Sequence, residues 1–442
     1  MRRKCPYREY AEKKKCVNTR DLTPSRQDFQ KYANNNVVSK LKSLTMCVIM
    51  QVSYMPKTNQ PTRRIFGRDE FIAETWLKLE RKSLYMNDLR RIGKTEIILK
   101  MLAETPSNWI ASFSDLEGTH TAEEFAASVY KDSAVVLNRK KGSLRKMTNF
   151  LGKAAGTEIM GIIKLPDGQP APWKDVLRAT FDDIAETLRE SNTAQRVVFL
   201  WDEVPYLIDN VAKRKGNDTA MQVFDILREL SQRHENIRFL LTGSIGIHHV
   251  LRSLWEDGYK GSPLNHMDLI QPGPLRPEHA LSFAESEMTR RGLRCSDVER
   301  GAAAISEAGC HVPYYIEKLT ARLPLGESIT RQTIEGELEK ELRSDDSDWD
   351  MDYYRRRVKT IFKNNEQLAL AVLDAMAGSS ASAMTFQEIR AVVNARMVTD
   401  DEVLREHLKL LCMDHYLERN DENAYRFYLP LVRRWWKINR SL

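Results

Sequence analysis

The fold is decided by residues 85–101, YMNDLRRIGKTEIILKM, where an apolar run passes through a polar loop into a helical pattern. The tripeptide GKT at 93–95 matches the end of a phosphate-binding loop of the form GxxxxGK[ST], which lies between a strand and a helix. Such a loop binds phosphate through converging backbone N–H groups, a lysine and the dipole of the following helix. We therefore predict that this stretch binds ATP, with Lys94 on the phosphates and the Thr95 hydroxyl on Mg²⁺.

The first glycine of that pattern is replaced by Asp88. This position starts the turn rather than contacting phosphate closely, and aspartate tolerates unusual backbone angles better than most residues. Its carboxylate must either point away from the phosphates or be offset by Arg90 or Arg91. We expect a functional loop whose nucleotide-binding residues are Asp88, Leu89, Arg90, Arg91, Ile92, Gly93, Lys94, Thr95 and Glu96.

Two acidic residues follow a second apolar run, RVVFLWDE at 196–203. Because phosphoryl transfer depends on positioning and charge neutralisation, we expect Asp202 to hold magnesium, directly or through water, and Glu203 to polarise the attacking water. The next run, IRFLLTGS, ends in Thr242 and Ser244, whose hydroxyls either sense the γ-phosphate or cap the following turn. The predicted catalytic residues are Lys94, Glu203 and Ser244, and the predicted metal ligands are Thr95 and Asp202.

The order of apolar segments predicts an α/β protein. Short strand-like runs alternate with longer helical ones up to about residue 275, which favours a parallel sheet with right-handed crossovers. Beyond that point the pattern is helical, and after residue 364 three helices precede a hairpin, which is the order of a winged helix-turn-helix. Strands are expected at 83–88, 108–118, 196–203 and 237–244, and a small hairpin at 158–168.

These patterns divide the chain into five expected parts. They are a basic, disordered tail at 1–63, a parallel-sheet P-loop ATPase domain at 64–274, a helical lid at 275–343, a linker at 344–363 and a winged helix-turn-helix at 364–442. A chain of 442 residues is too long for one small core, so a multidomain protein is expected.

The net charge of +7 comes from the N-terminal segment. Residues 1–64 carry 15 Lys/Arg and 4 Asp/Glu, a net charge of +11, which leaves a net charge of −4 for the remainder of the chain. The remainder therefore offers no overall basic surface for nucleic acid. The apolar runs are far shorter than the roughly 20 residues that span a bilayer, and the basic start is followed by no apolar signal segment. With six scattered cysteines, we expect a protein of the reducing cytoplasm.

Taken in order, the motifs resemble the archaeal-type ATPase family of the AAA+/STAND class of P-loop NTPases, whose members carry a C-terminal winged helix. The resemblance covers roughly residues 64–440. It rests on FGRDEFI (66–72), LRRIGKT (89–95), FLWDEVPYLID (199–209), LLTGSIG (240–246), VPYYIEKL (312–319) and YRFYLPLVRRWWK (425–437).

The resemblance implies further site residues. Arg68 and Glu70 would flank the region of the nucleotide base, Ser244 would be the sensor, and Pro313 of the lid would contact the nucleotide. His311 stands where the lid motif of the family usually has glycine. Arg252 and Arg276 are candidates for an arginine finger.

His248 and His249 are adjacent in the sequence, so we expect them on different faces of a helix. Core or surface roles are therefore favoured over a metal site.

The function that these features favour is an ATP-dependent molecular switch, in which the nucleotide state moves the winged helix and slow hydrolysis resets it. One alternative is a DNA-binding initiator-like or regulatory protein, and another is a nucleotide-binding scaffold in which Asp88 has abolished hydrolysis. The helix at 401–414 starts with Asp400, Asp401 and Glu402, which repel phosphate, so a protein partner is favoured over DNA. Oligomerisation is open, and no membrane is expected.

Overall fold

The computed structural model describes residues 65–137, 157–159, 162–164, 171–191, 194–244, 246–362 and 365–442. The basic tail expected at 1–63 lies outside these residues. No helix in the described ranges is long and apolar enough to cross a membrane.

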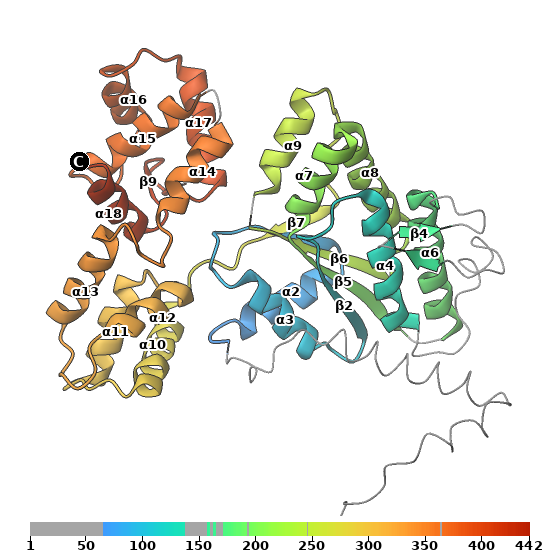
Figure 1. Ribbon diagram of the computed structural model, residues 1–442, viewed down its shortest axis with the longest axis horizontal. Coiled ribbons are helices and arrows are strands. Elements are labelled where there is room, and N and C mark those ends of the chain that lie inside the picture. The colour runs from blue at the N-terminus through green and yellow to red at the C-terminus, as the bar shows by residue number, and fades with distance from the viewer. Residues whose placement is uncertain are drawn as a thin grey trace, which may run out of the picture. The chain divides into compact units, whose positions relative to one another are not determined.

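A central sheet of five parallel strands organises the first half of the chain (Figure 1). Its order is β2–β5–β6–β1–β7. The strands are β1 (Ser83–Met86), β2 (Trp109–Asp115), β5 (Arg196–Asp202), β6 (Ile237–Thr242) and β7 (Met267–Ile270). The first four were predicted, and β7 was not. The expected hairpin is also present, as antiparallel β3 (Thr157–Ile159) and β4 (Ile162–Lys164).

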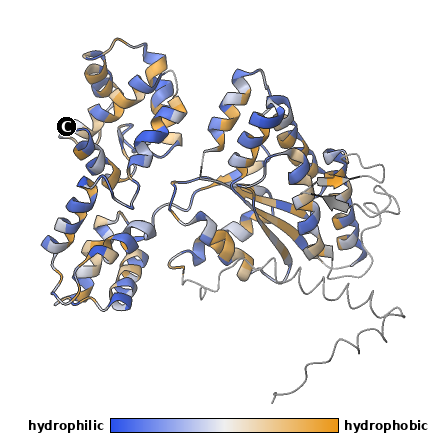
Figure 2. Ribbon diagram, viewed as in Figure 1, coloured by the Kyte–Doolittle hydropathy of each residue, from blue (hydrophilic) through white to orange (hydrophobic). Residues whose placement is uncertain are grey.

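Helices cover both faces of this sheet, because successive strand residues point to opposite sides. In β5, Val198 and Leu200 pack with α2 (Asp69–Leu79) and α3 (Lys94–Ala103). The alternate β5 residues pack on the other face with α4 (Ala122–Leu137), α6 (Trp173–Glu190), α7 (Val204–Lys215), α8 (Asn217–Arg233) and α9 (Ile247–Glu256). Figure 2 shows the apolar colouring concentrated on the strands. Each such side chain contributes about 1.5–3 kcal/mol through burial.

Helices dominate the second half of the chain. The first group is α10 (Pro277–Arg291), α11 (Val298–Ala308), α12 (Pro313–Arg322) and α13 (Arg331–Arg343). The range 344–363, expected to be a linker, contains helix α14 (Asp352–Phe362). Its Tyr354, Val358 and Phe362 recur every fourth residue and are buried, as one face of an amphipathic helix should be.

Three more helices precede a hairpin, in the predicted order. They are α15 (Glu366–Gly378), α16 (Phe386–Asn394) and α17 (Asp401–Met413), followed by antiparallel β8 (Leu417–Arg419) and β9 (Tyr425–Phe427) and by α18 (Pro430–Asn439). Trp435 and Trp436 of α18 are buried, as expected, and the Trp436 indole N–H donates to Asp374 at 2.8 Å.

A single hydrophobic cluster joins α10–α13 to α14–α18. Leu89 and Ile92, from the loop between β1 and α3, belong to the same cluster, together with Tyr315 and Ile316 of α12. The apolar side chains of the glycine–lysine loop are therefore buried against the helical half of the chain rather than against the sheet.

Candidate functional site

The predicted site residues meet at the carboxyl edge of the parallel sheet. Residues 87–93 follow β1, Asp202 ends β5, and Ser244 follows β6, which lies between those two strands. Since the carboxyl ends of parallel strands point the same way, three segments far apart in the sequence are brought together, and such edges are where α/β sheets bind ligands.

The backbone of the loop is shaped for an anion. Arg91 and Gly93 both adopt left-handed conformations, with φ of 71° and 95°, and α3 begins directly after them. Such turns direct successive N–H groups into one concavity, and the helix N-terminus adds its partial positive charge. A β-carbon on Gly93 would meet only the Glu96 carboxylate, at 3.8 Å, so glycine is favoured here by its backbone angle and not by crowding.

Lys94 is buried beneath this loop. Its ammonium donates to the carbonyl oxygens of Asp88, at 2.8 Å, and Leu89, at 2.7 Å. Burial lowers the pKa of Lys94 to about 8, although the charges of Asp88, Glu203 and Asp202 act in the opposite direction. An anion bound at the loop would further stabilise the charged form of this side chain.

Thr95 and Asp202 form an oxygen pair suited to a divalent cation. The Thr95 hydroxyl donates to Asp202 Oδ2 at 2.6 Å, and Asp202 Oδ1 accepts from the backbone N–H of Glu203 at 3.0 Å. Burial raises the pKa of Asp202, and these two hydrogen bonds counter it. Hydroxyl and carboxylate oxygens are what Mg²⁺ prefers, so the chemistry of the pair fits this ion.

Glu203 is held in an uncommon conformation next to that pair. Its φ is 57°, a left-handed value that costs a residue with a side chain on the order of 1–3 kcal/mol. Its Oε2 accepts from the Ser244 backbone N–H at 2.9 Å and from the Ser244 hydroxyl at 3.1 Å. Burial raises the pKa of Glu203, and the Ser244 bonds oppose the rise. A β-carbon on Gly243 would lie 2.4 Å from Pro205 and 3.4 Å from Glu203 Oε2, so this position must stay small.

The carboxylate of Asp88 points away from the loop concavity. One oxygen accepts from the Leu89 N–H at 2.7 Å and the other from the Gly273 N–H at 2.6 Å. Arg68 is buried beside it and donates to the carbonyls of Pro272, Ile92 and Gly273. Asp88 and Arg68 thus tie the loop to residues 272–273, between β7 and α10, and the Arg68 guanidinium is occupied by backbone oxygens.

Arg90 and Arg91 pair with the segment before α14 and not with Asp88. Arg91 donates to the Trp349 carbonyl and, at 3.1 Å, to the Asp350 carboxylate, and its guanidinium lies 4.4 Å from the centre of the Tyr314 ring. Arg90 lies 3.8 Å from Asp350 and covers the ring of Tyr353. Both loop arginines therefore contact the segment before α14, and Arg91 also contacts α12 whereas Arg90 contacts α14.

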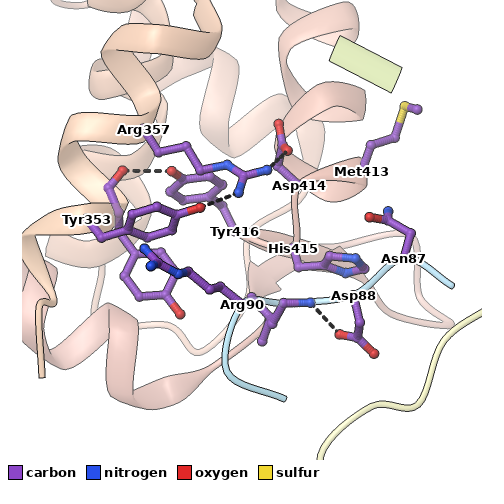
Figure 3. Close-up of a pocket in the computed structure, with 11 residues that line it drawn as sticks. Asn87, Asp88, Arg90, Tyr353, Arg357, Met413, Asp414, His415 and Tyr416 are labelled. Atoms are coloured by element: carbon purple, nitrogen blue, oxygen red, sulfur yellow. Dashed lines mark hydrogen bonds and ion pairs between the residues drawn. The ribbon is translucent and has the colours of Figure 1, made fainter. Parts of the chain in front are cut away.

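A pocket opens between the loop and the C-terminal helices (Figure 3). The empty space within it is about 330 Å³, which includes space open to solvent. Two of its sides are Asn87–Arg90 and the turn Met413–Tyr416 after α17, and Tyr353, Tyr354 and Arg357 of α14 complete it. In Figure 3 the side chains of Arg357, Asp414 and His415 lie above the loop residues Asp88 and Arg90.

Three other predicted residues, Glu70, Arg252 and Arg276, form ion pairs outside this group of side chains. Glu70 and Arg276 form an exposed ion pair at 2.7 Å, and Arg252 pairs with Glu256 and Glu406. Thr95 and Glu96 are exposed, Pro313 begins α12 beside Tyr314, and the Thr242 hydroxyl is buried with no hydrogen-bond partner in the described residues.

His248 and His249 do not diverge as expected. At the start of α9 both rings turn toward Asp414, with Nε2 atoms 3.4 Å and 2.6 Å from its oxygens. The three side chains could offer ligands to a metal ion. The expectation of divergent faces was wrong because the two histidines sit in the first turn of α9, and their ring centres are 4.1 Å apart.

Sequence reasoning missed Arg357, Asp414 and His415. They belong to the range expected to be a linker and to the turn after α17, and no local pattern links them to a loop near residue 90. Asp414 is buried and therefore requires charged or hydrogen-bonding partners, but this burial is a property of the fold and is not visible in the sequence.

Comparison with known proteins supports the fold. No family model and no curated protein matches the chain. Among solved structures, a Walker-type ATPase of Pyrococcus abyssi matches with a TM-score of 0.57 and 17% identity, covering 86% of this chain and 99% of that one. The ORC2 protein of Aeropyrum pernix, in ADPNP and ADP complexes, has a TM-score of 0.46 at 13% identity, covering 87% and 98%. The RuvB Holliday junction branch migration motor of Thermotoga maritima has 0.35 at 11% identity, covering 81% and 91%. The first of these likenesses identifies the fold as that of a Walker-type ATPase.

Proposed function

We propose that this chain is an ATP-binding molecular switch of the AAA+/STAND class of P-loop NTPases, and that it hydrolyses ATP slowly. The observation that carries the proposal is the contact of 2.6 Å between the Thr95 hydroxyl and Asp202, directly beside Lys94 and the left-handed loop. A lysine, a hydroxyl and a carboxylate around an anion concavity are the parts that a Mg²⁺–ATP site needs. The fold shared with a Walker-type ATPase agrees with this reading.

Each residue has a role in the proposed site. Lys94 exchanges the carbonyls of Asp88 and Leu89 for the β- and γ-phosphates, and Thr95 and Asp202 hold the metal. When bound, Mg²⁺ supplies positive charge that neutralises the phosphates. Glu203 accepts a proton from the attacking water, and Ser244 holds the Glu203 carboxylate in place.

The switch itself would reside in the C-terminal half. We assign α10–α13 as the lid and α15–α18 with β8 and β9 as the winged helix, which matches the order of its elements. Support comes from the pocket, because α14 and the turn after α17 share its wall with the loop that would bind phosphate. A nucleotide that prefers one placement of these helices shifts their equilibrium. The first turn of α17 is acidic, so we assign its exposed face to a protein partner and not to DNA.

Binding of a fluorescent ATP analogue to the full chain tests the proposal. With Mg²⁺ the wild-type protein should bind, and Lys94→Ala should weaken binding roughly 10-fold to 100-fold, because a charge-assisted hydrogen bond is lost. Lys100→Ala is the matched control, since Lys100 lies on the same helix but pairs with Asp69 and Glu104. Equal affinity of wild-type and Lys94→Ala protein would refute the assignment of the site.

The binding should also weaken at alkaline pH. In the free protein the pKa of Lys94 is about 8, and phosphate binds the charged form, so the complex takes up a proton above that pH. Affinity should therefore be constant below about pH 7.5 and fall up to tenfold per pH unit above about 8. Titrations between pH 6.5 and 9.5 measure this. Lys94→Arg, whose guanidinium does not titrate, should remove the slope, and a flat wild-type profile would show that Lys94 does not contact the phosphates.

Asp88→Gly restores the usual loop sequence but should not increase turnover. The carboxylate already points toward Gly273, and its removal leaves two backbone N–H groups without acceptors, which costs about 1–3 kcal/mol. Thermal unfolding and phosphate release are measured together, and Asp88→Asn, which keeps an acceptor oxygen, should lose less stability. If Asp88→Gly instead released phosphate much faster than wild type, Asp88 would be a natural brake on hydrolysis.

A further inference from the structure

We propose that Arg357 of α14 is a positioning residue for hydrolysis, which acts on Glu203 through Ser244. The inference rests on the proposed function, because it takes Glu203 as the group that accepts the proton from water. It goes further by naming the contact through which the C-terminal helices would control the rate of the chemical step.

A continuous chain of hydrogen bonds joins the two halves of the protein at this point. Arg357 Nη1 donates to the Ser244 carbonyl at 2.9 Å, and the N–H and hydroxyl of Ser244 donate to Glu203 Oε2 at 2.9 Å and 3.1 Å. The Arg357 guanidinium in α14 is thus linked to the Glu203 carboxylate, which follows β5, through two successive hydrogen-bonding contacts of Ser244. The guanidinium is itself well buried, with 13% of its side chain exposed, so these bonds are protected from competing water.

Asp414 fixes the direction of the guanidinium. Arg357 Nη2 donates to Asp414 Oδ1 at 2.9 Å, and the Tyr353 hydroxyl accepts a further bond from Nη1 (Figure 3). Burial alone would raise the pKa of Asp414, but the neighbouring imidazoles of His248 and His249 and the charge of Arg357 hold it below its ordinary value. The carboxylate therefore stays ionised and anchors one side of the planar guanidinium while the other side is aimed at Ser244.

The geometry of Glu203 makes it sensitive to this anchor. Its left-handed backbone is sparsely populated, so the surrounding contacts must hold it. Both Ser244 bonds fall on Oε2, which orients the carboxylate while Oε1 takes neither of them. If Arg357 no longer fixes the Ser244 carbonyl, the turn after β6 can shift, and the carboxylate shifts with it. A displacement of about 1 Å at a catalytic group can cost on the order of 100-fold in rate.

Two other roles for the same cluster predict different results. Arg357 also lines the pocket beside Asp88 and Arg90, so it could contact phosphate directly. His248, His249 and Asp414 could instead hold a metal ion. The guanidinium bound to the same carboxylate opposes a second cation there, which is why we favour the positioning role.

The test compares kcat, KM and ATP affinity of the full chain in Arg357→Ala, in Arg357→Lys and in wild type, each alone and combined with Glu203→Gln. We expect Arg357→Ala to lower kcat roughly 10-fold to 100-fold with ATP affinity within threefold of wild type. Arg357→Lys should recover part of the loss, because it keeps the charge and can donate hydrogen bonds but lacks the planar guanidinium. In the Glu203→Gln background Arg357→Ala should cause no further loss. The control Arg355→Ala, exposed on the same helix, should match wild type.

Folding is checked by thermal unfolding, because Arg357→Ala leaves Asp414 buried without its ion-pair partner. The neutral pair Arg357→Gln with Asp414→Asn removes both charges, and it should show the same loss of kcat.

An unchanged kcat in Arg357→Ala or in the neutral pair would overturn the proposal. A loss that persists in Glu203→Gln, or a loss of ATP affinity, would assign Arg357 to the phosphates. If these variants kept the wild-type kcat and a chelator specific for zinc lowered it, His248, His249 and Asp414 would be assigned to a metal site. Wild-type protein that neither binds nor hydrolyses ATP would refute the proposed function itself.

Discussion

Replacing Glu203 with glutamine should reduce ATP turnover by about 100-fold or more while ATP remains bound. Glutamine has nearly the same shape and can still accept the Ser244 hydrogen bonds, but it cannot take a proton from water. The buried position of Glu203 raises its pKa, which suits a base that must gain a proton during the reaction. Single-turnover phosphate release, with the amount of bound nucleotide measured in parallel, gives the two quantities separately.

Glu104→Gln is the matched control for this experiment. Glu104 ends α3 and pairs with Lys100 on the surface, so the same chemical change is made away from the predicted site. Its turnover should equal that of wild type. If Glu203→Gln turned over ATP at the wild-type rate, another group would have to be the base. The hydrogen bonds of Ser244 to Glu203 would then have no role in catalysis.

Replacing Trp349 with alanine should lower the free energy of unfolding by about 3–5 kcal/mol. Trp349 is fully buried, its ring centre lies 5.7 Å from that of Tyr315, and its carbonyl accepts from Arg91. The truncated side chain would leave a cavity in the cluster that joins α12, α14 and the loop after β1. Urea denaturation measures the loss.

Trp255→Ala is the comparison, since 47% of the Trp255 surface is exposed and its indole N–H donates to Gly261. Its cost should remain below about 1 kcal/mol. Trp349→Phe should lie between the two, because most of the ring volume is kept. Equal losses for Trp349→Ala and Trp255→Ala would show that the side chain of Trp349 is not packed in the hydrophobic cluster.

The strands that carry the candidate site could be predicted because they are buried on both faces. β5 and β6 are continuous apolar runs that end in polar residues, which is the pattern of a central parallel strand. β7 could not be predicted in the same way. It is an edge strand of four residues whose middle pair, Asp268 and Leu269, is exposed, so it has no apolar run.

The packing of the segment before α14 could not be predicted, because residues 344–352 are mostly acidic and polar. Its charges read as a solvated connector, yet Asp348 and Asp350 are satisfied by cations on other elements, and Trp349 between them is fully buried. The orientation of the Asp88 side chain could not be predicted either. It depends on a hydrogen bond from the backbone N–H of Gly273, which is far along the chain. Local sequence patterns predict elements, whereas these contacts depend on which elements the fold brings together.

Phosphate release from ATP by the purified full chain with Mg²⁺, compared with the same measurement on Lys94→Ala, tests whether the chain is an ATPase. We expect slow release by the wild-type protein that is lost in Lys94→Ala and on removal of Mg²⁺ with a chelator. Release that is equal in the two proteins, or absent from a wild-type protein that also fails to bind the nucleotide, would contradict this expectation.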